Sequence, residues 1–181
     1  MIVEKTKLND LLLIKPKLYS DDRGFFYVSW NSAELEGFIG KKNLFVQDNH
    51  SKSNKNVLRG LHYQIKYPQG KLVRTTYGSV FDVVVDLRKN SSTFGKTFEI
   101  ELSAKNKYQL WIPPGFAHGF LVLSKYAEFQ YKTTNLYKPE YEKTIIWNDK
   151  ILNINWPLEK KFPILSDKDK KGLNFEESEY F

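Results

Sequence analysis

The chain has 181 residues, of which 41% are apolar and 15% aromatic, so it fits one domain with a sizeable core and is not a disordered chain. It has no cysteine, which excludes disulfides, thiolate metal sites and a thiol nucleophile, and suits a reducing cytoplasm. The net charge of +7 favours an anionic partner, but Lys is scattered among Asp and Glu with no long run of like charges, so we expect neither nucleic-acid binding nor membrane insertion.

The N-terminal residues carry no targeting or membrane signal. Residues 1–5 contain no long apolar stretch of the kind that a secretory signal needs. The apolar run at residues 11–14 is far too short to span a bilayer. We therefore expect a cytoplasmic protein.

Short apolar runs separated by turn residues dominate the chain, which is the pattern of β-strands. In residues 97–102 the apolar side chains Phe98, Ile100 and Leu102 alternate with polar ones and so share one face. Turns are indicated by Asp-Arg-Gly at 22–24, by Gly78 and by Pro-Pro-Gly at 113–115. The predicted strands cover residues 11–19, 25–30, 45–50, 57–64, 72–77, 80–87, 97–102, 109–112, 119–123 and 128–134.

Helical signals are few. Asn31 or Ser32 can cap a short helix that runs through Glu36, and Ser166 can cap another that begins at Asp167. Neither a repeat nor a linker interrupts the chain. The sequence therefore predicts an all-β antiparallel sandwich, jelly roll or barrel with a few short helices.

Charged residues within the strand-like runs point to a polar interior. The continuous run Val83–Val85 is typical of a strand that is buried on both faces, and Asp82 lies directly before it. Arg59 lies within the run 57–62. Because a charge inside such a run is costly unless it is paired or faces a wet cavity, we expect Arg59 to point into the barrel interior. For Asp82 the interior and a solvated strand end are equally good interpretations.

The titratable residues have two possible roles, as metal ligands or as groups for acid–base catalysis. The three histidines include no His-x-His pair, and the residue two positions after His62 is Gln64, so we predict no metal site. His62 has an ordinary pKa near neutrality, as a general base needs, but a hydrogen-bonded core histidine fits the pattern as well. Tyr131 is either a proton donor facing a cavity or a packing residue, and Lys71 either stabilises an oxyanion or lies on the surface.

The joint order and spacing of nine segments carry a family resemblance from about residue 13 to residue 169. The segments are 22–26 (DRGFF), 46–51 (VQDNHS), 57–62 (VLRGLH), 69–74 (QGKLVR), 81–83 (FDV), 86–89 (DLRK), 112–120 (IPPGFAHGF), 131–135 (YKTTN) and 147–149 (WND). Together they resemble the dTDP-4-dehydrorhamnose 3,5-epimerase family.

The resemblance implies a cupin-type jelly roll spanning residues 1–181, with a C-terminal segment at about 158–181 that packs on it or extends from it. It also implies a homodimer and an enzyme with no metal and no cofactor. The implied reaction inverts C3 and C5 of a nucleoside-diphospho 4-keto-6-deoxy sugar, converting dTDP-4-dehydro-6-deoxy-D-glucose to dTDP-4-dehydro-L-rhamnose.

The same resemblance assigns roles to residues. His62 matches the general base, Tyr131 the general acid and Asp169 the carboxylate that pairs with the histidine. Arg23 and Arg59 match residues that hold the diphosphate. The other implied substrate contacts are Gln47, Asp48, Asn49, Lys71, Asp82, His118, Glu142 and Lys168.

Two positions depart from the family pattern, and both concern the nucleotide base. Val28 stands where many members have a glutamate, and Leu136 stands where many have an aromatic residue, although Tyr137 adjoins it. The alternatives are inversion at C3 only, a different nucleotide such as GDP, a non-catalytic sugar-nucleotide binder, and a metal-dependent cupin.

Overall fold

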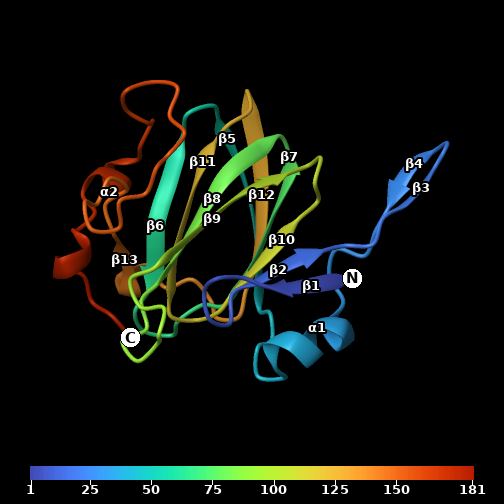
Figure 1. Ribbon diagram of the computed structural model, residues 1–181, viewed down its shortest axis with the longest axis horizontal. Coiled ribbons are helices and arrows are strands. Elements are labelled where there is room, and N and C mark those ends of the chain that lie inside the picture. Colours follow the sequence, from blue (N-terminus) through green and yellow to red (C-terminus); the bar gives the residue numbers. More distant parts are fainter.

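The structure is a computed structural model that describes residues 1–181, and it consists mainly of two antiparallel sheets that face each other (Figure 1). The six-stranded sheet has the order β1 (Ile2–Lys5), β2 (Leu12–Lys15), β10 (Gln109–Ile112), β7 (Lys71–Tyr77), β12 (Tyr126–Thr133) and β5 (Gln47–Asn54). The five-stranded sheet has the order β13 (Glu142–Thr144), β6 (Leu58–Gln64), β11 (Phe116–Val122), β8 (Ser79–Asp86) and β9 (Thr97–Ser103). The predicted all-β jelly-roll class is confirmed.

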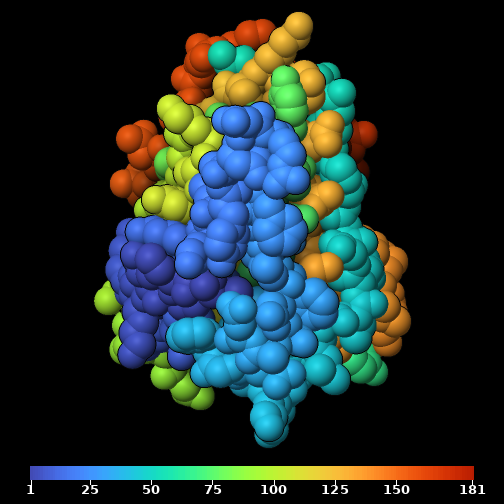
Figure 2. All heavy atoms as spheres, turned by 90° about the vertical axis from the view of Figure 1, so that its right-hand side faces the viewer, coloured from blue at the N-terminus to red at the C-terminus, as the bar shows by residue number.

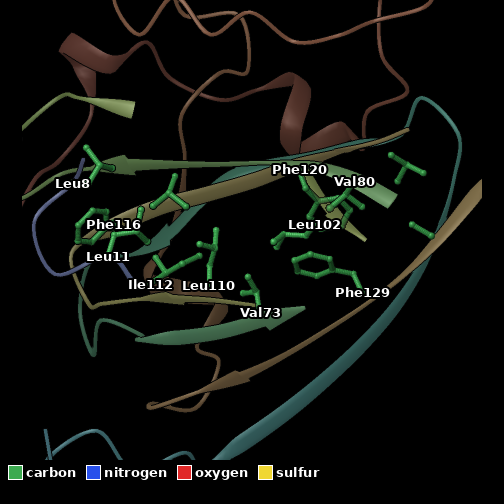
Figure 3. Close-up of a cluster of buried hydrophobic side chains, with 13 residues drawn as sticks. Leu8, Leu11, Val73, Val80, Leu102, Leu110, Ile112, Phe116, Phe120 and Phe129 are labelled. Carbon is green, nitrogen blue, oxygen red and sulfur yellow. The ribbon is translucent and has the colours of Figure 1, made fainter. Parts of the chain in front are cut away.

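The inner faces of the two sheets meet in an apolar core (Figure 3). Val80 of β8 and Phe120 of β11 face Val73 of β7 and Phe129 of β12, as the period-two alternation of strands requires. The rings of Phe120 and Phe129 stack with their centroids 4.4 Å apart. These two rings also border the cavity described below, so the core forms part of its wall.

The C-terminal part of the chain covers the outer face of the five-stranded sheet. Val83 and Val85 of β8 point away from the inner core and pack in a second cluster with Trp156 and Phe175. The backbone N–H of Leu58 also donates a hydrogen bond to the carbonyl of Ile164, 3.0 Å away. The strand that contains the valine run is therefore buried on both faces, as predicted.

Helix α1 (Ser32–Ile39) covers part of the outer face of the six-stranded sheet. The extended residue Asn31 caps it, and the Asn31 side chain accepts a hydrogen bond from the backbone N–H of Glu34. Leu35 is the buried residue of the helix and packs against Leu72 and Trp111. Of the two caps that the sequence offered, Asn31 and Ser32, the helix uses Asn31.

Some predicted boundaries are wrong. The run 11–19 divides into β2 and a separate strand β3 (Tyr19–Asp21), and Pro16, which cannot donate a ladder hydrogen bond, lies between them. Only Gly24–Phe26 of the next apolar run forms a strand, β4. The short edge strands β1 and β13 were not predicted, because their mixed, largely charged residues lack an apolar alternation.

Strands β3 and β4 form a hairpin that stands away from the two sheets (Figure 1). Its aromatic side chains Tyr19, Phe25 and Phe26 are 54%, 58% and 65% exposed. Viewed from the right-hand side of Figure 1, the hairpin and α1 lie along the middle of that face of the molecule (Figure 2). No helix of the structure has the length and apolar character needed to cross a bilayer.

Candidate active site

A cavity of about 360 Å³ opens between the two sheets. Both sheets contribute to it, because inward-facing residues of β5, β7 and β12 meet those of β6, β11 and β13. Its volume lies in the range of small-ligand sites. The lining residues are Gln47, Asn49, Ser51, Arg59, His62, Gln69, Lys71, His118, Gly119, Phe120, Phe129, Tyr131, Tyr137, Glu142 and Lys168.

His62 and Asp169 form a hydrogen-bonded pair at the cavity wall. His62 lies on β6, and its Nε2 is 2.5 Å from Oδ1 of Asp169. Asp169 belongs to the short helix α2 (Asp167–Lys170), whose predicted cap, Ser166, accepts from the Asp169 N–H and donates its hydroxyl to Oδ2 at 2.6 Å. The carboxylate is therefore fixed behind the imidazole, and His62 alone of the two lines the cavity.

The surroundings keep this pair in the form of a neutral imidazole and a carboxylate. Burial lowers the pKa of His62 below its usual value, and the hydrogen bond that His62 donates to Asp169 offsets only part of this effect. Burial alone would raise the pKa of Asp169, but hydrogen bonds from His62 and Ser166 bring it below its usual value. At neutral pH the imidazole can therefore accept a proton, and the carboxylate can stabilise the resulting imidazolium.

Lys71 points into the cavity from β7 without a protein partner. The residue is 9% exposed, and its ammonium group makes no hydrogen bond or ion pair within the protein. Burial lowers the pKa of Lys71 to about 8, against the opposing charges of Glu142 and Asp82. A buried, unpartnered ammonium is costly, and an anionic or strongly polarised oxygen in the cavity would offset that cost.

Tyr131 faces the cavity from the opposite sheet to His62. It lies on β12, on the same face of that strand as the core residue Phe129. Its hydroxyl makes no hydrogen bond to another protein group. Burial raises the pKa of Tyr131, and the charge of Glu142 adds to this effect, so the phenol keeps its proton at neutral pH. Tyr131 is thus a phenol available to donate a proton into the cavity.

Glu142 joins several cavity residues into one polar network. Its Oε2 accepts hydrogen bonds from the hydroxyl of Tyr137 at 2.8 Å and from the ammonium of Lys168 at 2.7 Å. Gln47 accepts a hydrogen bond from the backbone N–H of Tyr137 and donates one to Asn49. This network orders the residues of the cavity before any ligand arrives.

Arg59 lines the cavity, as predicted for an inward-pointing residue, but it is not buried there. The residue is exposed, and its Nε donates a hydrogen bond of 2.9 Å to the hydroxyl of Ser53. The physical reason is its place at the open side of the cavity, where the guanidinium stays hydrated. Its terminal nitrogens make no hydrogen bond within the protein.

Three other predicted contacts lie away from the cavity surface. Asp48 falls on the outer face of β5 and pairs with Lys132, because side chains on a strand alternate and its neighbours Gln47 and Asn49 point inward. Asp82 is fully buried behind His118, so of its two interpretations the solvated strand end is wrong. Arg23 lies at the tip of the projecting hairpin and pairs with Asp21, with 90% of its side chain exposed.

Sequence reasoning missed several lining residues. Ser51 lies two positions beyond Asn49 on β5, so period-two alternation could have found it. Gln69 and Tyr137 come from loops, where no periodicity applies, and Phe120 and Phe129 read as ordinary core positions. The structure brings together no group of three or more side chains of the metal-binding types, while the absence of a metal in the reaction stays a prediction.

Comparison with known proteins places the chain in a family. The family described as dTDP-4-dehydrorhamnose 3,5-epimerase matches residues 5–177. The dTDP-4-dehydrorhamnose 3,5-epimerase of Shigella flexneri is 57% identical, over 100% of this chain and 99% of that protein.

Solved structures agree in fold and differ in reaction. The dTDP-6-deoxy-D-glucose-3,5-epimerase of Legionella pneumophila, solved with dTDP-4-keto-L-rhamnose, superposes with a TM-score of 0.92 at 49% identity, covering 96% of this chain and 92% of that one. ChmJ of Streptomyces bikiniensis, a 3'-monoepimerase solved with dTDP-quinovose, gives 0.88 at 28% identity, covering 93% and 85%. On the sequence match and the shared fold, the chain belongs to the dTDP-4-dehydrorhamnose 3,5-epimerase family and is a carbohydrate epimerase.

Proposed function

We propose that this enzyme inverts C3 and C5 of dTDP-4-dehydro-6-deoxy-D-glucose by general acid–base catalysis, without metal or redox cofactor. The observation that carries the proposal is the placement of His62 and Tyr131 on opposite sheets across one cavity. A base and an acid on opposite walls can remove a proton from one face of a sugar ring and return one to the other.

The chemistry of the substrate makes this pair sufficient. A ketone at C4 acidifies the hydrogens at C3 and C5, because loss of either proton gives an enolate. His62 takes the proton, Asp169 stabilises the imidazolium, and Tyr131 donates a proton from the opposite face. The ammonium of Lys71 faces the negative charge that develops on O4, and such a preorganised donor is worth about 3–4 kcal/mol in other enzymes.

Two observations support a nucleoside diphosphate as part of the substrate: a ligand bound to a relative, and a positive charge at the cavity. The Legionella enzyme was solved with a dTDP-linked keto sugar, which supports the same substrate class here. Arg59 stands at the open side of the cavity with free terminal nitrogens, and guanidinium groups bind phosphate oxygens through paired hydrogen bonds. The sugar then lies inside, near His62, and the diphosphate near Arg59.

The second candidate reaction is inversion at C3 alone, as in the 3'-monoepimerase ChmJ. A different nucleotide is the second candidate for the carrier, because Val28 and Leu136 depart from the family pattern at positions that concern the base. A panel of dTDP-, GDP- and UDP-linked 4-keto-6-deoxy sugars, with products identified by NMR, tests these points. We expect conversion of the dTDP compound at both centres. Product inverted only at C3, or a faster reaction with GDP or UDP substrates, would contradict the proposal.

We also propose that residues 1–181 act as one folding unit and assemble as a homodimer in the cytoplasm. The C-terminal segment supplies Asp169 to the cavity wall, which supports one unit. The projecting hairpin exposes Phe25 and Phe26 beside Arg23, a surface that suits a second copy and lets Arg23 reach the partner's diphosphate site. Sedimentation should give twice the 21.3 kDa chain mass, and a monomer would contradict the dimer.

Substitution of Arg59 by alanine should weaken dTDP binding about tenfold or more and leave the melting temperature nearly unchanged. A charge-assisted hydrogen bond to phosphate is worth about 1.5–3 kcal/mol, whereas within the protein the exposed guanidinium loses only one hydrogen bond, to the hydroxyl of Ser53. Ser53→Ala is the matched control, since it removes that bond and keeps the charge. Calorimetry that finds equal dTDP affinity in Arg59→Ala would give Arg59 another role.

The pH profile of kcat/KM should be bell-shaped. Activity falls at acid pH as His62 is protonated, and this limb lies below pH 6.5 because the pKa of His62 is lowered from that value. It falls again as the Lys71 ammonium loses its proton, at a pKa of about 8. Lys71→Arg should move the alkaline limb upward, since guanidinium stays protonated. An alkaline limb at the same pH in that variant would assign it to another group.

A further inference from the structure

A second buried histidine–carboxylate pair lies beside the first one. His118 of β11 is the register partner of His62 on β6 and also lines the cavity. Its Nε2 is 2.9 Å from Oδ2 of Asp82, which lies on the neighbouring strand β8. His118 Nδ1 makes no hydrogen bond within the protein. The pair therefore links a residue of the cavity wall, His118, to a carboxylate that is buried behind it.

The burial and hydrogen bonding of Asp82 do not suit a residue whose role is to stabilise the fold. Asp82 is 0% exposed, and it shares the inner face of β8 with the core residues Val80 and Val84. Its Oδ1 has no hydrogen-bond partner, whereas both oxygens of Asp86, an equally buried carboxylate on the same strand, accept several hydrogen bonds. A half-satisfied buried carboxylate destabilises a core, which points to a role in the cavity.

The contact determines what His118 presents to the cavity. An ionised carboxylate only accepts hydrogen bonds, so Nε2 must carry the proton that it shares with Asp82. In a neutral imidazole the other nitrogen, Nδ1, then has a lone pair and is an acceptor. A sugar ring bound next to His62 offers hydroxyl groups as donors at this place.

We propose that Asp82 is a positioning residue that holds His118 in the Nε2–H tautomer, so that Nδ1 accepts a hydrogen bond from a hydroxyl group of the bound sugar. Asp82 acts through His118 and touches no substrate atom, which replaces the direct contact expected from the sequence. This role rests on the proposed function, because it requires a sugar in the cavity.

The test combines tautomer detection with binding. In protein labelled with ¹⁵N-histidine, two-bond ¹H–¹⁵N correlations identify the tautomer of each of the three histidines, and His118→Asn assigns the signal. We expect wild-type His118 to be the Nε2–H tautomer and Asp82→Asn to contain both tautomers. Wild-type His118 in the Nδ1–H form would overturn the proposal, whether or not any variant folds.

Kinetics separate positioning from a structural role. Asp82→Asn should raise KM for the dTDP-linked sugar about tenfold, the effect of one lost hydrogen bond, and leave the Kd for dTDP unchanged. Its melting temperature should be equal or higher, since a buried charge is removed. The control Asp86→Asn should lower the melting temperature and leave the His118 tautomer unchanged.

The contradictory outcomes are distinct. An unchanged KM or tautomer in Asp82→Asn would overturn the role, and so would a fall in melting temperature with equal losses for dTDP and the sugar nucleotide. A wild-type enzyme inactive on every 4-keto sugar would overturn the proposed function instead. The tautomer measurement would still decide whether Asp82 positions His118.

Discussion

His62→Asn should reduce hydrogen exchange at both C3 and C5 by at least about 10²–10⁴-fold, the range of general acid–base catalysis. His62 has a carboxylate held behind it by a helix cap and lies across the cavity from Tyr131. The other cavity imidazole, His118, is instead paired with the core carboxylate Asp82. The fold should survive, because an asparagine amide can still donate to Asp169. Exchange is followed by NMR in deuterated buffer.

His50→Asn provides the matched control. His50 also lies on a strand and also contacts a carboxylate, Glu128, but it points away from the cavity on the outer face of β5. Its substitution should leave the exchange rate unchanged. Exchange near the wild-type rate in His62→Asn would remove His62 from the role of base.

Tyr131→Phe should separate deprotonation from inversion. The ring keeps its packing against Phe129, and the lost hydroxyl makes no protein hydrogen bond, so we expect a stability change below about 1–2 kcal/mol. His62 still removes a proton, and the imidazolium can return one to the same face. The variant should therefore exchange deuterium into unchanged substrate much faster than it forms the epimer.

The quantity to compare is the ratio of exchange to inversion, with Tyr63→Phe as control. Tyr63 is the neighbour of His62 on β6, but its hydroxyl donates to the carbonyl of Glu179 outside the cavity. That control should lose stability and keep the wild-type ratio. If Tyr131→Phe inverts as readily as it exchanges, another group supplies the second proton.

Sequence patterns predicted the elements whose local signal agrees with their burial. The alternation at residues 97–102 became β9, and the caps at Asn31 and Ser166 begin α1 and α2. The exposed aromatic residues around Phe25 and Phe26 were read as part of a longer strand, because hydrophobicity in the sequence does not reveal whether a segment packs on its own chain.

The site residues likewise divide into those that a local sequence pattern predicts and those that depend on tertiary packing. The periodicity of β5 is enough to place Gln47 and Asn49 in the cavity and Asp48 outside it, so that error was avoidable. The depth of Asp82 and the exposure of Arg59 depend on how segments far apart in the sequence pack around them, which no local pattern encodes. Asp169 lies 107 residues from His62, and without the family resemblance nothing in the sequence would pair them.

Solvent deuterium incorporation by the wild-type enzyme tests metal-independent acid–base catalysis most directly. The enzyme is treated with a chelator and incubated in deuterated buffer with dTDP-4-dehydro-6-deoxy-D-glucose, and C3 and C5 are followed by NMR. We expect deuterium at both positions at the same rate before and after chelation, together with the inverted product. No incorporation, or incorporation only after a divalent metal is added, would contradict this mechanism.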